Sequence, residues 1–140
     1  MPDREKVLLV VREWLVKAEG DLQAAAHLLS LGPKCPCFIV CFHAQQCAEK
    51  YMKAMLVLEL IDFPKTHDLE KLMTLLPGAA RPKLTTQEQK TLTEYATVSR
   101  YPGRSDISLS EARRALAITR RVRKSIRRLL PKEVLQTRKP

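Results

Sequence analysis

Apolar residues recur at steps of three and four positions over most of this 140-residue chain. This spacing is the period of an α-helix, in which such positions share one face. The pattern predicts five helices and no strand, over residues 3–30, 36–60, 66–76, 85–99 and 108–130. The second stretch is apolar almost all round, which is typical of a central, buried helix. Because the connections are short, we expect antiparallel packing in an all-α, up-and-down bundle of four to five helices.

Capping residues mark the starts of the later helices. Thr66 is predicted to cap the third helix, with Asp68 in its first turn. Thr85 and Ser108 each stand three positions before a glutamate, which is the spacing of a capping box. These signals agree with the starts that the apolar pattern gives.

The composition is that of one soluble globular domain, with 45% hydrophobic and 29% charged residues and only 4 glycines. No apolar run approaches the roughly 18 residues of a membrane span, and the N-terminus does not resemble a signal peptide. We therefore expect a cytoplasmic protein without a membrane partner. The helical bundle is predicted over residues 1–130, followed by a basic flexible tail over residues 131–140.

The formal net charge of +10 is confined to one end of the sequence. Lys and Arg balance Asp and Glu over residues 1–99, whereas residues 100–140 hold thirteen basic and three acidic residues. A positive field confined to one element favours an anionic partner, such as a nucleotide, RNA or an acidic protein surface.

Most of this excess lies on the final predicted helix, opposite its apolar stripe. The cations on that face are Arg113, Arg114, Arg120, Arg121, Lys124, Arg127 and Arg128. One interpretation is a face that binds phosphates, with an affinity that falls steeply as salt rises. The other is a solvated face that only keeps the protein soluble. The helix lacks the interleaved aromatic residues that stack on single-stranded bases.

A polar stripe on the central helix holds His43, Gln46, Glu49, Lys50 and Lys53. Its simplest interpretation is the solvent face of an amphipathic helix. The alternative is that Gln46, Lys50 and Lys53 line a groove for a phosphate or a partner.

The segment between the last two helices carries Arg100, Tyr101 and Arg104. An arginine beside a rigid Tyr-Pro turn is preorganised for contact with a phosphate or RNA. Alternatively, Arg100 caps the preceding helix and pairs with Asp21, a carboxylate predicted close to the apolar face of the first helix.

The cysteines and histidines predict neither a metal site nor a cofactor. Cys35, Cys37, Cys41 and Cys47 do not follow zinc-ligand spacing, so we expect small buried residues. The three histidines are scattered over three helices, and no spacing of a catalytic triad accompanies them.

The stretch FHAQQCAEKYMKA, residues 42–54, resembles the second helix of the HEPN family. Further pieces agree in order: Trp14 to Ala25 in the first helix, Thr66-His67-Asp68-Leu69 before the third, and Arg100-Tyr101-Pro102 after the fourth. The resemblance covers residues 8–130.

This resemblance implies an all-α, homodimeric bundle similar to the helical C-terminal domain of kanamycin nucleotidyltransferase and often encoded beside a minimal nucleotidyltransferase. Many HEPN proteins are ribonuclease toxins in which four to six residues separate an arginine from a histidine. Arg100 matches that arginine, but Asp106 and its neighbours stand where the histidine belongs, and no histidine follows His67. Without an imidazole to move protons near neutral pH, we expect no ribonuclease activity.

The sequence therefore predicts a non-enzymatic HEPN module, the dimeric partner of a minimal nucleotidyltransferase in a toxin–antitoxin-like pair, which helps to bind a nucleotide or RNA. Its apolar second helix also favours a homodimer. One alternative is a divergent ribonuclease that uses Arg100 with Asp106 or His67. Another is a helical protein-interaction module without an anionic ligand. The predicted anion-binding residues are Gln46, Lys50, Lys53, Arg100, Tyr101, Arg104, Arg120, Arg121, Lys124, Arg127 and Arg128.

Overall fold

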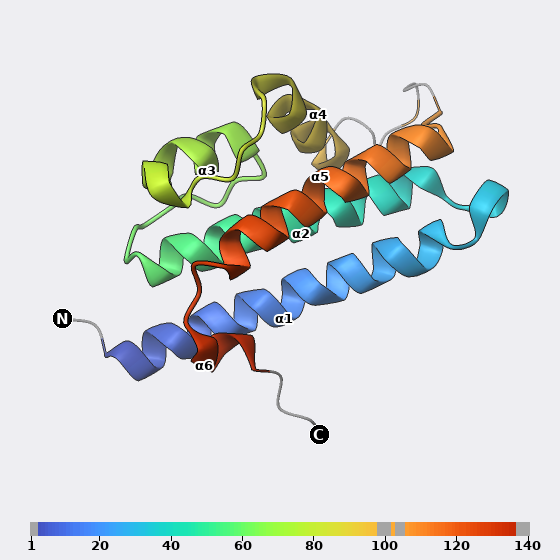
Figure 1. Ribbon diagram of the computed structural model, residues 1–140. Coiled ribbons are helices and arrows are strands. Elements are labelled where there is room, and N and C mark those ends of the chain that lie inside the picture. Colours follow the sequence, from blue (N-terminus) through green and yellow to red (C-terminus); the bar gives the residue numbers. More distant parts are fainter. Residues whose placement is uncertain (1–2, 98–101, 103–105, 137–140) are drawn as a thin grey trace.

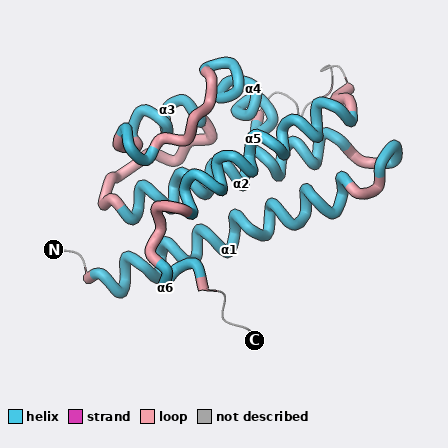
Figure 2. Tube along the Cα trace, viewed as in Figure 1, coloured by secondary structure: helices cyan, strands magenta, loops and turns pink. Residues whose placement is uncertain are grey.

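The computed structural model of the chain describes residues 3–97, 102 and 106–136, and all regular elements within them are helical (Figures 1 and 2). The α-helices are α1 (Arg4–Leu29), α2 (Cys37–Leu58), α3 (Leu69–Leu75), α4 (Thr86–Ala96), α5 (Leu109–Arg127) and α6 (Lys132–Leu135). Two single 3₁₀ turns, η1 (Gly32–Lys34) and η2 (Gly78–Ala80), lie in the connections. The predicted all-α bundle is confirmed.

Helix α2 is the centre of the bundle. The long helices α1 and α2 form an antiparallel pair, and α5 runs along α2 in the same direction as α2 (Figure 1). Helices α3 and α4 cover a further side of α2. Large side chains of α2, such as Tyr51, Met52, Met55 and Leu56, are fully or almost fully buried, as its nearly continuous apolar sequence predicts.

The predicted caps are confirmed at α4 and α5 and shifted at α3. Thr85 forms a capping box with Glu88. The Ser108 hydroxyl accepts a hydrogen bond of 3.0 Å from the backbone N–H of Glu111 in the first turn of α5. At α3 the cap is Asp68, and Thr66 instead accepts the Asp68 N–H at 3.0 Å. Thr66 therefore orders the turn before the helix, and the Asp68 carboxylate receives the free N–H groups of the first turn.

The described part of the predicted flexible tail forms a helix. After Pro131 the chain turns back and α6 packs on α1, where Val134 is buried (Figure 1). The Arg12 guanidinium donates a 2.7 Å hydrogen bond to the Glu133 carbonyl. The buried Val134 side chain and this hydrogen bond hold residues 131–136 against the bundle. A helix of four residues is too short to be predicted from apolar periodicity.

Within the described residues, none of the helices is both long enough and apolar enough to cross a membrane.

Candidate functional site

The candidate site is built on α5, whose rotation about its axis is fixed by its buried face. Ala112, Leu116, Val122 and Ile126 pack into the core on that face. Between them Thr119, which is fully buried, donates a 2.7 Å hydrogen bond to the Ala44 carbonyl of α2. Because these contacts set which side of α5 faces inward, its basic residues are presented on the outside.

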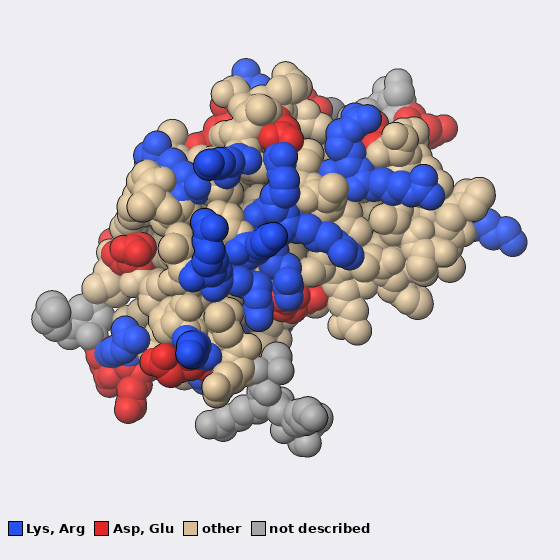
Figure 3. All heavy atoms as spheres, in the orientation of Figure 1, with Lys and Arg blue, Asp and Glu red and all other residues tan. Residues whose placement is uncertain are grey.

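These basic residues surround an open depression with a volume of about 1180 Å³. Figure 3 shows the Lys and Arg side chains gathered over α5 in the middle of the displayed face. One part of the lining comes from α5, and another comes from the segment after α3. The lining residues are Leu22, Gly78, Ala79, Arg81, Lys83, Arg120, Arg121, Arg123, Lys124, Ser125, Arg127 and Arg128. Among the described residues, therefore, no carboxylate and no aromatic side chain lines the depression.

Two of the arginines are held by a single carboxylate from α1. Arg123 Nε lies 2.8 Å and Arg127 Nη1 lies 3.0 Å from Oε1 of Glu19. The Tyr51 hydroxyl donates to the same oxygen, and Arg127 Nη1 also lies 3.1 Å from the Tyr51 oxygen. Burial, reinforced by the bond to Glu19, raises the pKa of Tyr51, so its hydroxyl stays protonated and remains a donor.

Two further arginines have fixed partners at the rim. Arg121 Nη2 forms a 2.7 Å ion pair with Oε2 of Glu88 on α4. Arg81 donates to the Leu76 carbonyl at 2.9 Å and to the Thr74 carbonyl at 3.2 Å, so its side chain caps the C-terminal end of α3. These contacts order the guanidinium groups before any ligand arrives.

Three of the cations between Arg120 and Arg128 have no acidic partner among the described residues. Arg120, Lys124 and Arg128 are exposed, and none of them forms a hydrogen bond or ion pair with the described part of the chain. They recur every four residues, so they form a row with steps of about 6 Å along the helix axis. Like charges at this spacing repel one another.

The structure thus brings together the five α5 cations that the sequence analysis named from Arg120 to Arg128. Arg113 and Arg114 are exposed on the same helix but do not line the depression. Three lining cations were missed: Arg123, Arg81 and Lys83. Arg123 stands three positions after Arg120 and four before Arg127, so helical spacing alone predicts it beside them.

The polar stripe of α2 is largely covered, because Glu49 and Lys53 are buried and His43, Gln46 and Lys50 are partly buried. Its interpretation as a solvent face is therefore wrong. Glu49 and Lys53 are only 3% and 7% exposed. Lys53 Nζ lies 2.9 Å from Glu49 Oε2, and it also stands over the rings of Trp14 and Phe63. Helix α1 and the segment before α3 cover this side of α2, which a helical-wheel argument on α2 alone does not reveal.

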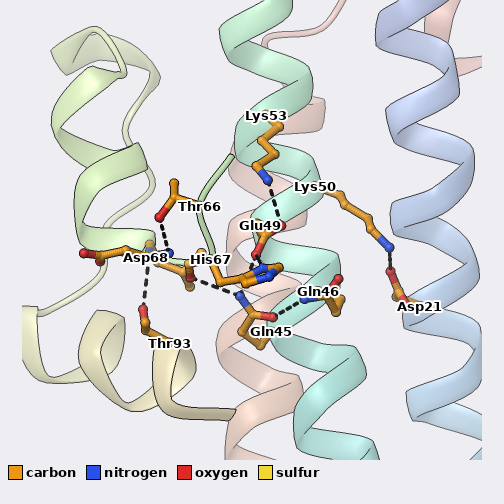
Figure 4. A network of polar contacts seen from close by, with 11 residues as sticks. Asp21, Gln45, Gln46, Glu49, Lys50, Lys53, Thr66, His67, Asp68 and Thr93 are labelled. Atoms are coloured by element: carbon orange, nitrogen blue, oxygen red, sulfur yellow. Dashed lines mark hydrogen bonds and ion pairs between the residues drawn. The ribbon is translucent and has the colours of Figure 1, made fainter. Parts of the chain in front are cut away.

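Glu49 is the centre of this network. Its Oε1 accepts hydrogen bonds from Gln45 Nε2 at 2.9 Å and from His67 Nδ1 at 2.8 Å (Figure 4). Gln46 in turn donates to Gln45 Oε1 at 2.6 Å. The imidazole of His67, the catalytic candidate of the ribonuclease alternative, is therefore bonded through Nδ1 to a buried carboxylate.

Asp21 is buried and partnered, but by side chains of α2. Lys50 Nζ lies 2.6 Å from Asp21 Oδ2, and His43 Nδ1 lies 2.8 Å from Asp21 Oδ1. The predicted anion-binding residues Lys50 and Lys53 are thus both neutralised within the fold. The suggested partner of Asp21, Arg100, lies outside the described residues.

Tyr101 and Arg104 also lie outside the described residues, and Asp106 is exposed at the start of the segment that leads to α5. The pairing of Arg100 with Asp106 or His67 in a divergent ribonuclease therefore stays a prediction.

The four cysteines divide into two groups. Cys41 and Cys47 are buried, as expected, whereas Cys35 and Cys37 are only partly buried. Burial, with the nearby Glu19 and Asp21 carboxylates, raises the pKa of Cys47 to about 12. In the described part of the chain, no three His, Cys, Asp or Glu residues are placed to share a metal ion.

Comparison with known proteins agrees with this fold. The crystal structure of TT1696 from Thermus thermophilus superposes with a TM-score of 0.71 at 25% identity, over 86% of this chain and 98% of that one. ST0689, described as an archaeal HEPN homologue, superposes with a TM-score of 0.65 at 26% identity, over 85% and 96% of the two chains. No curated protein sequence matches this chain significantly. The family model of the HEPN domain matches residues 11–129, so the chain belongs to the HEPN domain family.

Proposed function

We propose that this chain is a non-enzymatic HEPN module that binds an anionic ligand in the basic depression and serves as the dimeric partner of a minimal nucleotidyltransferase. The observation that carries the proposal is the row of cations Arg120, Lys124 and Arg128, which the fold gathers at one depression without an acidic partner among the described residues.

The arrangement favours a binding role over a solubility role. A merely solvated surface usually mixes charges of both signs, because mixing avoids repulsion between neighbours. Here acidic groups from other helices hold Arg121, Arg123 and Arg127 in place, while the row beside them stays unneutralised. Ordered guanidinium groups lose less freedom when they bind a phosphate, so this arrangement suits an anionic ligand.

The proposal of a non-enzymatic role rests on the chemistry of the same residues. The charged side chains of the described lining are all arginine or lysine, and it holds no histidine or carboxylate, the groups that most often act as general acids and bases. In the described part of the chain, no histidine lines the depression.

The proposal of a homodimer is supported by apolar side chains on α1 that the bundle does not cover. Leu9 and Val16, which are two helical turns apart, are 52% and 65% exposed. Exposed apolar residues on one helix face favour association with another protein surface.

The test is a set of titrations with mixed-sequence RNA, ATP and a purified minimal nucleotidyltransferase, each at 50 and 200 mM salt. We expect binding that weakens steeply with salt, RNA that is recovered uncut, and a light-scattering mass of two chains. The variant R120E/K124E/R128E should lose at least ten-fold in affinity, because each phosphate contact contributes to the salt-dependent binding energy. It leaves Arg123 and Arg127 in place, since these residues also hold Glu19.

A matched control reverses three exposed lysines elsewhere, K17E/K65E/K90E, which changes the net charge by the same amount. This control should bind nearly as well as the original chain. If no anionic ligand binds at low salt, or if both triple variants weaken binding equally, the depression is not the binding site and the proposal is wrong.

A further inference from the structure

We propose that the ligand of the basic depression is a double-stranded nucleic acid, held by its phosphate backbones without readout of its bases. This inference rests on the proposed function and names the class of its anionic ligand.

The chemistry of the lining favours backbone contact over contact with bases. Proteins that hold single strands stack the bases on aromatic side chains, and no described aromatic residue lines the depression. Asn, Gln, Asp and Glu, which read adenine and cytosine edges, are also missing from its described lining. The cations that remain suit phosphates, which carry the same charge at every position of a sequence.

The shape of the depression favours a polymer over a single nucleotide. Its volume of about 1180 Å³ exceeds the range of roughly 300–1000 Å³ that is usual for small-molecule pockets. Leu22 and Ala79 are the largest apolar side chains among its described lining residues, so it offers little surface against which a base could be buried. A nucleotide would therefore be held by its phosphates alone.

An acidic protein surface fits less well. Protein interfaces combine arginines with several buried aromatic and large apolar side chains, and lysine is depleted in them. The depression combines Lys83 and Lys124 with six arginines, and among its described lining residues Leu22 is the one large apolar side chain and none is aromatic. Affinity from charge alone is typical of nucleic-acid backbones.

The arrangement of the cations favours two strands over one. The row from Arg120 to Arg128 extends over about 12 Å along a rigid helix. Arg81 and Lys83 add a second group of cations from the segment after α3, and Arg81 is fixed by two carbonyls. A duplex presents two rows of phosphates at a fixed separation and twice the charge per length of one strand, so it engages both groups without first being ordered.

The experiment compares four probes by fluorescence anisotropy or competition: an RNA duplex, a DNA duplex of the same sequence, a non-pairing uridine strand of equal length, and ATP. We expect the duplexes to bind about ten-fold tighter than the single strand, and ATP to compete only weakly. The three phosphate contacts of the row alone predict a loss of at least about 40-fold in duplex affinity between 50 and 200 mM salt, and contacts with Arg81 and Lys83 add to it. A duplex of different sequence should bind within about two-fold of the first. The RNA and DNA arms show whether the 2′-hydroxyl contributes.

Variants at the second group of cations test the two-strand geometry. R81A/K83A should weaken binding of the duplex at least five-fold and binding of the single strand less than two-fold, and K17A/K65A should change neither. Arg81 also caps α3, so its removal alters the fold locally. The variant K83A alone leaves that cap intact, and it should weaken duplex binding more than single-strand binding, by a smaller factor than R81A/K83A.

The outcomes separate this inference from the proposed function. Single strand or ATP that binds as tightly as duplex would overturn the inference and leave an anion-binding role intact. If the nucleotidyltransferase binds but no nucleic acid does, and R120E/K124E/R128E blocks that binding, the inference is also overturned and the anion-binding role remains. Strong dependence on duplex sequence would also contradict backbone recognition. If none of these partners binds at low salt, the proposed function itself fails.

Discussion

Helices α2 and α5 both carry several charged residues at helical spacing, but these residues differ in burial and in pairing. On α2 the cations Lys50 and Lys53 are largely buried, and each is paired with a carboxylate. On α5 the row Arg120, Lys124 and Arg128 is exposed and has no such partner in the described part of the chain. The charges of α2 are therefore neutralised within the fold, whereas, among the described residues, those of this row are not.

The difference depends on where the acidic residues lie. Glu49 stands on α2 itself, one helical turn from Lys53, and Asp21 reaches Lys50 from α1. Helix α5 holds few acidic residues of its own and receives Glu19 and Glu88 from other helices. These two carboxylates hold Arg121, Arg123 and Arg127, and the remaining row keeps its charge.

The largest expected effect comes from breaking the network of α2. Glu49→Ala removes the acceptor for Lys53, Gln45 and His67 and leaves a lysine ammonium group buried without its partner. Loss of one member of a buried pair typically costs about 3–5 kcal/mol, so we expect a fall of that order in the free energy of unfolding. Urea denaturation followed by circular dichroism measures it.

Glu13→Ala on the exposed face of α1 is the matched control, and it should change the free energy of unfolding by less than about 0.5 kcal/mol. A loss below about 1 kcal/mol for Glu49→Ala would show that water replaces the missing carboxylate, and the network would then not support the fold.

The two helices also differ in how much of their environment can be predicted from the sequence. Apolar periodicity and capping boxes are local properties, so they predicted the five main helices and the caps at Thr85 and Ser108. The outward face of α5 followed for the same reason, because a continuous apolar stripe determines which side of a helix is buried.

Burial of a charged stripe, in contrast, depends on residues distant in the chain. Trp14 and Phe63 cover Lys53, and His67 reaches Glu49, but no local pattern around residue 50 indicates these contacts. Arg81 and Lys83 join the depression for a similar reason. Their loop is brought beside α5 by the packing of α3 and α4, which the sequence of the loop does not encode.

A smaller effect on the free energy of unfolding is expected from the titration of Cys47, which is buried on α2. Its pKa is raised from 9.0 to about 12 in the folded chain, so between these values the folded state keeps a proton that the unfolded state has lost. The contribution to stability is complete below pH 9 and is lost as pH rises toward 12. Wild type should therefore lose about 1.4 kcal/mol more stability than Cys47→Ala between pH 8 and pH 10.

The measurement is urea denaturation of both proteins at each pH, and the difference between them removes the titration of lysines and tyrosines that they share. An equal loss in both proteins would mean that the folded chain does not hold the proton on Cys47.

The smallest expected effect on stability comes from the exposed row of α5. Removing its charges in R120A/K124A/R128A eliminates repulsion between neighbours one helical turn apart and breaks no bond to another described residue. Such repulsion is typically a few tenths of a kcal/mol per pair, so the variant should be slightly more stable than the original chain at low salt. Added salt screens exposed charges, and the gain should vanish near 1 M salt. Thermal unfolding at low and high salt is the measurement, and the loss in Glu49→Ala should respond far less to salt because that network is buried. A marked destabilisation of R120A/K124A/R128A at low salt would mean that the row supports the fold, and the contrast between α2 and α5 would disappear.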